Sequence, residues 1–339
     1  MWLLLLALVS FVRVGLAPPL ASAPSGEAIL RRAAQAFRRV PYQGRRLTTL
    51  WLEHRTEGIE CVEYADGRGR SRVEYLAPRS ARGRVIIDDG RNHWQVEPGG
   101  HRVFRVDASP LEAEAAWEIP LLMRNYTVAL APGRHVVARR DAYKLLLRPK
   151  HAGKPHETLW VDRWTYLVLR REARHADGAP ARWTTFTDIT YHPNTPPARF
   201  EFRPPPHARI DPAPSPERQQ DVLAAQRFIG APYPFPQRLP SLGFERHAAL
   251  CRDSAGKRTV HLLYDDGIAT LSVFMDRQGN HDSIRQGRRV WIGGQPAWLK
   301  TDHHFAVLRW AARGLRYTVV GDLTVDALLK VAHDLNAAR

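Results

Sequence analysis

Between residues 41 and 202, short segments rich in β-branched and aromatic residues follow one another, separated by turns that contain Gly, Pro and Asp. The stretch Thr158 to Glu172 shows the pattern best. Trp160-Val161-Asp162 and Leu167-Val168-Leu169 flank a polar turn over 163–165. Alternation on both sides of a tight reversal is typical of an antiparallel hairpin. We therefore predict an antiparallel meander of about a dozen strands, which is expected to curl because open sheets of that size do.

The pattern predicts strands at 45–54, 59–64, 72–76, 85–87, 93–97, 102–106, 127–131, 135–139, 143–147, 158–162, 167–173, 182–191 and 200–202. A helix is predicted over 26–39, with Ser25 as its cap and one apolar face. A second helix is predicted over 110–124, and Pro120 is expected to kink or end it. Helices packed on one face of a curled sheet would enclose an apolar cavity, as in a half-open β-barrel.

A Pro-rich segment, residues 204–216, has the composition of a stiff linker. We predict that it separates a large domain, residues 24–203, from a smaller one, residues 217–339. The smaller domain is expected to contain a short helix near 217–228, seven strands and a C-terminal helix over 324–338 capped by Thr324. Asp265-Asp266-Gly267 indicates a hairpin within it. The predicted fold class is α+β.

The N-terminus predicts export. Trp2 to Val12 is an apolar run too short to span a bilayer comfortably, and Ala21-Ser22-Ala23 is an A-x-A cleavage pattern. We predict a signal peptide over 1–23 and a periplasmic or extracytoplasmic location, peripheral to the membrane at most. An uncleaved anchor stays open, because Arg13 follows the apolar run instead of preceding it.

The net charge of +16 favours anionic partners: nucleic acid, anionic lipid head groups or an acidic protein segment. Free use of Arg by a GC-rich genome is the alternative. The basic residues are spread along the strands and the chain is predicted to be exported, so we expect no nucleic-acid partner. The two cysteines, Cys61 and Cys251, are expected to be separate thiols, with a disulfide as the alternative.

No convincing catalytic pattern is present. The sequence has no Gly-rich phosphate loop and no G-x-S-x-G motif. Asp302 with His303-His304 is the best metal candidate, but neighbours on a strand point to opposite faces. The pairs Asp88-Asp89 and Asp265-Asp266 each precede Gly, which turn formation explains better than acid–base chemistry. We expect a non-enzymatic protein without metal or cofactor.

Several motifs occur in an order that resembles the MucB/RseB family, periplasmic regulators of envelope-stress sigma factors. The motifs of the first domain are 41–44, 72–75, 85–94, 159–170, 183–189 and 200–202. Those of the second are 239–240, 243–244, 263–274 and 317–323. The family's large domain resembles the lipoprotein carriers LolA and LolB.

The resemblance implies a non-enzymatic regulator. Its half-open barrel would hold acyl chains of a lipid or lipoprotein, and its small domain would bind the periplasmic part of a membrane-anchored anti-sigma factor. Binding would shield that factor from regulated proteolysis, and lipid occupancy would release it. A lipid or lipoprotein carrier and an envelope protein-binding or adhesion module are the alternatives. An enzyme would need polar residues near 93, 101, 135 and 303 to converge in one pocket.

Strand alternation suggests which residues would face the cavity, although ordinary core packing is the alternative for most of them. The candidates are Leu50, Leu52, Ile87, Trp94, Val96, Phe104, Trp117, Leu121, Leu145, Trp160 and Leu169. For an acidic segment of the anti-sigma factor, the candidate partners are Arg288, Arg289 and Arg316, because Arg pairs carboxylates bidentately.

Overall fold

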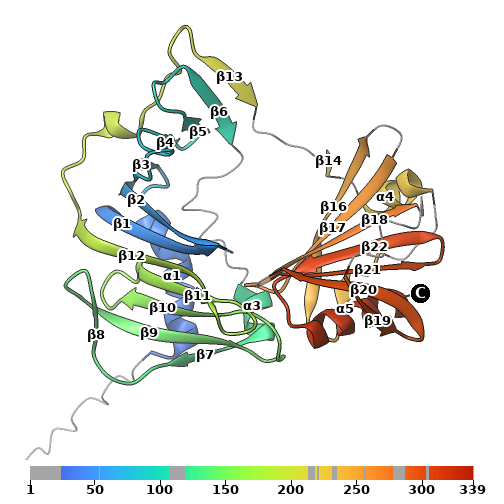
Figure 1. Cartoon of the computed structure of the whole chain (residues 1–339). Helices are drawn as coiled ribbons and strands as arrows, with labels where there is room; N and C mark the ends of the chain where they lie inside the picture. Colours follow the sequence, from blue (N-terminus) through green and yellow to red (C-terminus); the bar gives the residue numbers. More distant parts are fainter. Residues whose placement is uncertain are drawn as a thin grey trace, which may run out of the picture.

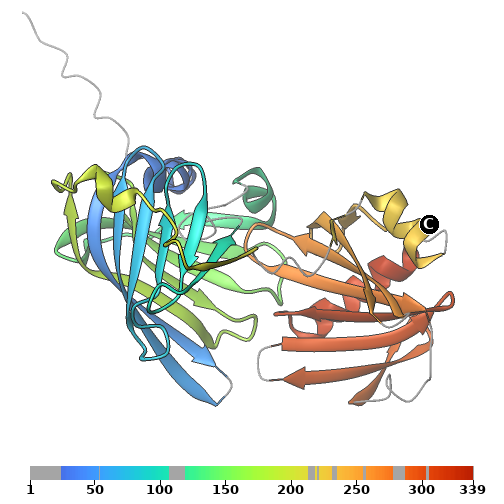
Figure 2. The same ribbon diagram turned by 90° about the horizontal axis from the view of Figure 1, so that it is seen from above.

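Two antiparallel sheets of unequal size form the framework of the computed structural model (Figure 1). It describes residues 24–338 with gaps at 53, 107–118, 213–217, 220, 231–234, 255–256, 278–286 and 303–304. Seen from above, the sheets lie side by side, and the larger one curls (Figure 2). This confirms the predicted fold class, a large curled antiparallel sheet with packed helices and a smaller sheet-and-helix unit.

The large sheet has thirteen strands among the described residues, in the order β13-β6-β5-β4-β3-β2-β1-β12-β11-β10-β9-β7, with β8 paired to β9. Their bounds are β1 (Pro41–Leu52), β2 (Arg55–Asp66), β3 (Ser71–Ala77), β4 (Val85–Asp88), β5 (His93–Val96), β6 (Arg102–Val106), β7 (Tyr126–Leu130), β8 (His135–Val137), β9 (Arg140–Pro149), β10 (His156–Asp162), β11 (Val168–Arg174), β12 (Pro180–Tyr191) and β13 (Arg209–Pro212). The predicted hairpin around residues 163–165 joins β10 to β11.

The sequence analysis was wrong at two places in the last part of this sheet. The strand predicted at 200–202 is absent from the described residues, and a 3-10 helix, η1 (Pro197–Phe200), precedes that position. Two consecutive prolines there fix φ and favour a turn. The Pro-rich segment, predicted as a spacer, contributes β13, which pairs with β6 in parallel at the sheet edge. Its proline is tolerated because an edge strand leaves one side unpaired.

Helix α1 (Gly26–Arg39) packs on the large sheet as predicted. Ser25 Oγ accepts a hydrogen bond from the Ala28 N–H at 3.2 Å and caps the helix. Its apolar residues Ile29, Leu30 and Ala33 share one buried cluster with residues of β9 and β10. A second helix, α3 (Ile119–Asn125), joins the same cluster through Ile119 and Leu122. Pro120 is in its first turn, where proline needs no hydrogen-bond partner. Residues 110–118 of the predicted helix lie outside the described residues.

The smaller sheet has nine strands among the described residues, in the order β14-β16-β17-β18-β22-β21-β20-β19, with β15 paired to β16. Their bounds are β14 (Arg218–Gln219), β15 (Arg238–Leu239), β16 (Phe244–Ser254), β17 (Lys257–Asp265), β18 (Thr270–Arg277), β19 (Arg288–Ile292), β20 (Gln295–Asp302), β21 (Phe305–Ala312) and β22 (Leu315–Gly321). Helices α4 (Val222–Ile229) and α5 (Val325–Ala337) complete its single apolar core.

Short polar motifs have the predicted structural roles. In the Asp88-Asp89 pair, Asp88 Oδ1 accepts from Gly90 N and Asp89 Oδ1 accepts from Arg91 N, each at 2.8 Å.

Cys61 is on β2 of the large sheet and Cys251 on β16 of the small one, as two separate thiols. His303-His304 lies outside the described residues. No helix of the described part has both the length and the apolar character to cross a bilayer.

Candidate functional site

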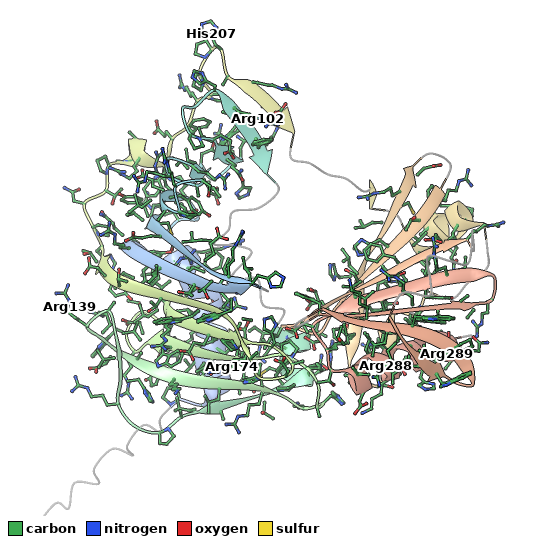
Figure 3. The ribbon with its side chains drawn as sticks, viewed as in Figure 1. Arg102, Arg139, Arg174, His207, Arg288 and Arg289 are labelled. Carbon is green, nitrogen blue, oxygen red and sulfur yellow. The ribbon has the colours of Figure 1, made fainter. Side chains whose placement is uncertain are left out.

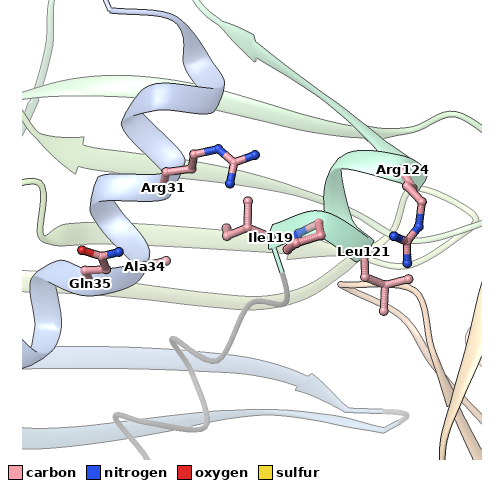
Figure 4. A pocket seen from close by; sticks show the side chains of 7 residues that line it. Arg31, Ala34, Gln35, Ile119, Leu121 and Arg124 are labelled. Carbon is pink, nitrogen blue, oxygen red and sulfur yellow. The ribbon is translucent and has the colours of Figure 1, made fainter.

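A pocket of about 570 Å³ lies between α1 and α3 on the helix-covered side of the large sheet (Figure 4). Helix α1 contributes Arg31, Ala34 and Gln35 to its wall. Helix α3 contributes residues 119–121 and Arg124. Its apolar part comes from Ala34, Ile119, Pro120 and Leu121, and the two arginines add positive charge on opposite helices. An apolar pocket with a few convergent charged groups is the usual form of a small-ligand site.

The two arginines are each paired with one carboxylate. Arg31 donates to Glu27 Oε1 one helical turn away at 2.6 Å. Arg124 Nη2 lies 2.7 Å from Glu245 Oε1 of β16, which belongs to the small sheet. Both arginine side chains are 52% exposed, so each still presents donors to solvent. Arg124 therefore links the wall of the pocket to the small sheet through its ion pair with Glu245.

The opposite side of α3 packs directly against the small-sheet unit. Asn125 is 2% exposed, and its Nδ2 donates to the carbonyls of Gly243 and Asp266, each at 3.0 Å. Leu122 lies against Gly267 so closely that a Cβ added there would be 2.5 Å from Leu122 Cα. One short helix thus forms both a wall of the pocket and part of the contact between the two sheets, which we call the domain junction.

A buried ion pair lies at the domain junction. Lys154 Nζ, in the loop between β9 and β10, is 2.5 Å from Asp266 Oδ2, and both side chains are 0% exposed. Lys154 also donates to the carbonyl of Leu242 at 2.9 Å. Tyr126 Oη donates to Asp266 Oδ2 at 3.2 Å. Asp266 Oδ1 accepts from the backbone N–H groups of residues 268 and 269. Each of these groups donates to Asp266, whose two carboxylate oxygens are the acceptors.

Burial shifts the pKa values of the groups around Asp266. Burial lowers the pKa of Lys154, and the negative charge of Asp266 opposes this shift. Burial raises the pKa of Tyr126, and the nearby Asp266 charge raises it further, so the phenol stays protonated and donates. Burial also lowers the pKa of His151, and the positive charge of Lys154 adds to the effect. The domain junction therefore contains buried charged and polar groups as well as apolar contacts.

A second set of contacts ties the other end of β11 to the small unit. His175 Nδ1 lies 2.7 Å from Asp322 Oδ2, and the Ala176 N–H donates to Asp322 Oδ1 at 3.0 Å. Thr324 was predicted to cap α5 with its side chain. Instead its N–H donates to the Gly153 carbonyl at 3.0 Å, and the side chain makes no capping bond. The start of α5 is thus held by the large-sheet unit.

The structure does not bring the predicted cavity residues together. Leu121 lines the pocket. Leu145 is fully buried in the cluster with α1, while Trp160 and Leu169 belong to a different buried cluster. These three have packing roles, which was the alternative for them.

The remaining candidates lie elsewhere on the large sheet. Ile87 pairs across strands with Trp94, whose ring packs on Phe202 at 5.7 Å. Val96 pairs with Val103, and Phe104 pairs with Gln95. Leu50 is partly buried and Leu52 is 43% exposed at the end of β1. Trp117 lies outside the described residues. Alternation identifies the buried face of a strand, but it cannot distinguish a wall that packs against a helix from one that faces a ligand.

The predicted partner arginines differ in availability. Arg288 and Arg289 are exposed on β19, the edge strand of the small sheet (Figure 3). The guanidinium of Arg289 lies over the Trp291 ring at 4.5 Å. Arg316, by contrast, is 12% exposed and pairs with Asp276 at 2.7 Å. It is therefore not presented to an acidic partner, which corrects the prediction for this residue.

Sequence reasoning missed the residues of the domain junction. Lys154 follows His151, Ala152 and Gly153 in a short loop, and the sequence gave no signal that it would be buried. Asp266 was assigned to the turn alone, whereas its carboxylate serves both the turn and Lys154. Asn125 was not singled out. The only signal in the sequence was that Lys154 and Asp266 each lie in a short loop. Sequence alone cannot pair two residues that are so far apart in the chain.

The contact between Gly267 and Leu122 gives a direct test of how tightly α3 packs at the domain junction. Gly267→Ala is expected to destabilise the chain by several kcal/mol more than Gly314→Ala. Both glycines have positive φ, +101° and +74°, but a Cβ at Gly314 would meet nothing within 4 Å. Urea unfolding of the two variants measures the difference. Equal losses would show that α3 does not pack against the small unit.

The fold is a pair of antiparallel sheets in which one helix, α3, forms both a wall of the pocket and part of the domain junction. Residues 25–205 match the MucB/RseB N-terminal domain family. This match covers more than half of the chain, and the chain belongs to the MucB/RseB family. No curated protein sequence matches the chain.

Two solved structures are similar to the chain over most of its length. One is described as MucB in complex with MucA(peri), with 20% identity, a TM-score of 0.57, and coverage of 91% of this chain and 96% of that chain. The other is the Pseudomonas aeruginosa MucA/MucB complex, with 20% identity, a TM-score of 0.58 and the same coverage. At this identity they show that the fold is shared.

Proposed function

We propose that this chain is a non-enzymatic regulator in the periplasm that binds the extracytoplasmic part of an anti-sigma factor. Lipid or lipoprotein acyl chains held by the large-sheet unit release that partner. The observation that supports the proposal most strongly is the double role of α3, which forms the pocket wall and contacts the small-sheet unit. A ligand that displaces α3 would change the domain junction as well.

Family membership and the shared fold support the choice of partner. The two similar structures are complexes of MucB with MucA, in one case with its periplasmic part. The exposed arginines of β19 support an acidic contact, since Arg pairs carboxylates well. The predicted signal peptide supports a periplasmic location. The proposed binding unit is the segment after the Pro-rich linker, residues 217–339.

The pocket supports a lipid ligand. Its apolar lining suits an acyl chain, because each buried CH₂ group contributes about 0.8 kcal/mol. Arg31 and Arg124 can bind the phosphate of a head group. Arg124 would then exchange its contact with Glu245 for the ligand, and one bond across the domain junction would be lost. Lipid lowers the affinity for the partner only if the partner binds the lipid-free form better.

A specific observation favours a second candidate, an envelope module that binds protein without lipid. Leu145 and the neighbouring apolar residues are covered by α1 from the chain itself. In that case the pocket would be an ordinary surface depression. Whether lipid co-purifies with the protein distinguishes the two candidates.

The partner proposal is tested by isothermal titration of the chain from residue 24 onward with the extracytoplasmic segments of anti-sigma factors from its own genome. We expect one segment to bind with a Kd below about 1 μM. Reversing both Arg288 and Arg289 to Glu should weaken this binding about tenfold or more, as expected for lost Arg–carboxylate pairs. The matched control reverses Arg134 and Arg139 on the large sheet, both highly exposed, and should change it little. The absence of binding to every segment would contradict the proposal.

A further inference from the structure

The β10–β11 turn presents a tryptophan to solvent. Trp164 is 81% exposed, at the tip of the hairpin that dominates the sequence pattern. Tryptophan is enriched at interfaces and in membrane-interface belts, where one end of the ring is in an apolar environment and the other is in water. Neither the pocket nor the domain junction uses this residue.

The turn that carries Trp164 is rigid because a buried carboxylate organises it. Asp162 is 0% exposed, and its Oδ1 accepts from the N–H groups of Trp164 and Thr165 at 2.8 and 2.9 Å. Its Oδ2 accepts from Arg140 Nε at 2.9 Å and from Tyr191 Oη at 3.2 Å. Burial would raise the pKa of Asp162, but the hydrogen bonds from Arg140, Thr165 and Trp164 outweigh it and hold this pKa below its usual value. These hydrogen bonds fix the backbone of the turn from which the exposed indole extends.

The neighbouring loops add apolar surface and arginines. The Arg163 N–H donates to the Asp141 carbonyl at 3.0 Å, and Asp141 pairs across strands with Val136 of β8. Val136 is 56% exposed. The side chains of Arg134 and Arg139 are 80% and 88% exposed, and Arg163 is exposed too. In Figures 1 and 3 this end of the large sheet, marked by β8 and Arg139, lies on the side away from the small unit.

The charges of this end are favourable for an anionic surface. Its exposed carboxylates, Asp141 and Asp188, are each within 2.9 Å of an arginine, Arg134 and Arg139 respectively. Arg163 instead lies over the Tyr143 ring at 4.7 Å and adds a positive charge. The whole chain, at +16, is attracted to anionic surfaces at long range.

We propose that the end of the large sheet formed by β8 and the β10–β11 turn docks on an anionic lipid membrane, with Trp164 inserted at the level of the head groups. Tryptophan is the residue that membrane proteins concentrate at this level, because it combines a large apolar ring with an N–H donor. Arginines around it can pair lipid phosphates. This docking surface goes beyond the proposed function: it would place the regulator at the membrane whether or not the pocket holds lipid.

The test is co-sedimentation of the chain from residue 24 onward with vesicles of phosphatidylcholine alone or mixed with phosphatidylglycerol. We expect binding to the mixed vesicles that weakens in high salt. Trp164→Ala should reduce the partition coefficient about tenfold or more, from the lost burial of one large side chain. The matched control is Trp291→Ala on β19, which removes a 57% exposed tryptophan of the small unit and should leave binding unchanged. Circular dichroism establishes that both variants are folded.

The proposal would be overturned by no binding of the unaltered chain to mixed vesicles, by equal binding of the two tryptophan variants, or by loss of anti-sigma binding in Trp164→Ala without any vesicle binding. The last would assign the turn to a protein partner. Vesicle binding that is lost when the α1–α3 pocket is blocked by Ala34→Trp, and kept in Trp164→Ala, would likewise overturn it, because the lipid would then be entering the pocket.

Discussion

Asp266→Ala is expected to lower the free energy of unfolding by about 3–5 kcal/mol, the usual cost of leaving one member of a buried ion pair alone. Lys154 would then keep its fully buried ammonium beside a single carbonyl acceptor. Asn125 would still donate to the backbone of residue 266, but the N–H groups of residues 268 and 269 would lose their acceptor, so the turn contributes to the loss as well. Urea unfolding followed by tryptophan fluorescence measures it.

Two comparisons isolate the ion pair from the turn. Asp265→Ala removes the neighbouring carboxylate, which accepts the Gly267 N–H at 2.6 Å, and should cost only about 1 kcal/mol. The double variant Lys154→Met, Asp266→Leu should be more stable than Asp266→Ala, because no buried charge is left uncompensated. If Asp266→Ala unfolds no more easily than Asp265→Ala, the pair contributes nothing to the domain junction.

Ala34→Trp is expected to empty the pocket of lipid while leaving the chain folded. Ala34 is partly exposed on α1, and an indole in its place would occupy the space between α1 and α3. Native mass spectrometry of protein purified from envelope extracts should show a stoichiometric lipid on the unaltered chain and about tenfold less on the variant, since a filled cavity cannot bury the acyl chain.

The control for this variant is Ala28→Trp, on the same helix but not among the residues that line the pocket. It should retain the lipid. A lipid that stays bound in Ala34→Trp would place the ligand elsewhere on the large sheet. An unaltered protein that is reproducibly empty would favour the envelope protein-binding module.

Sequence reasoning worked best where one local pattern specifies the structure. The 163–165 turn, the capped helix after Ser25 and the turn at residues 265–267 all follow from short-range rules of alternation and capping. It was least successful where tertiary contacts decide. The Pro-rich segment gains a strand because β6 offers an unpaired edge.

The functional residues show the same limit. Leu121 was identified as apolar and ligand-facing, and it lines the pocket. Leu145 has an equally apolar pattern but packs under α1, because the position of that helix cannot be deduced from β9. Lys154 and Asp266 are 112 positions apart in the numbering, so nothing local indicates that they meet. Pairing at that distance is a property of the folded chain alone.

The most direct test of the regulatory mechanism is the affinity for the anti-sigma segment, measured by calorimetry on delipidated protein and on the same protein loaded with its native lipid. We predict that lipid weakens binding about fivefold or more, within the usual range of coupling between two sites, and that Ala34→Trp removes the difference. Equal affinities for the two forms would contradict the account, because the pocket and the partner surface would then be independent.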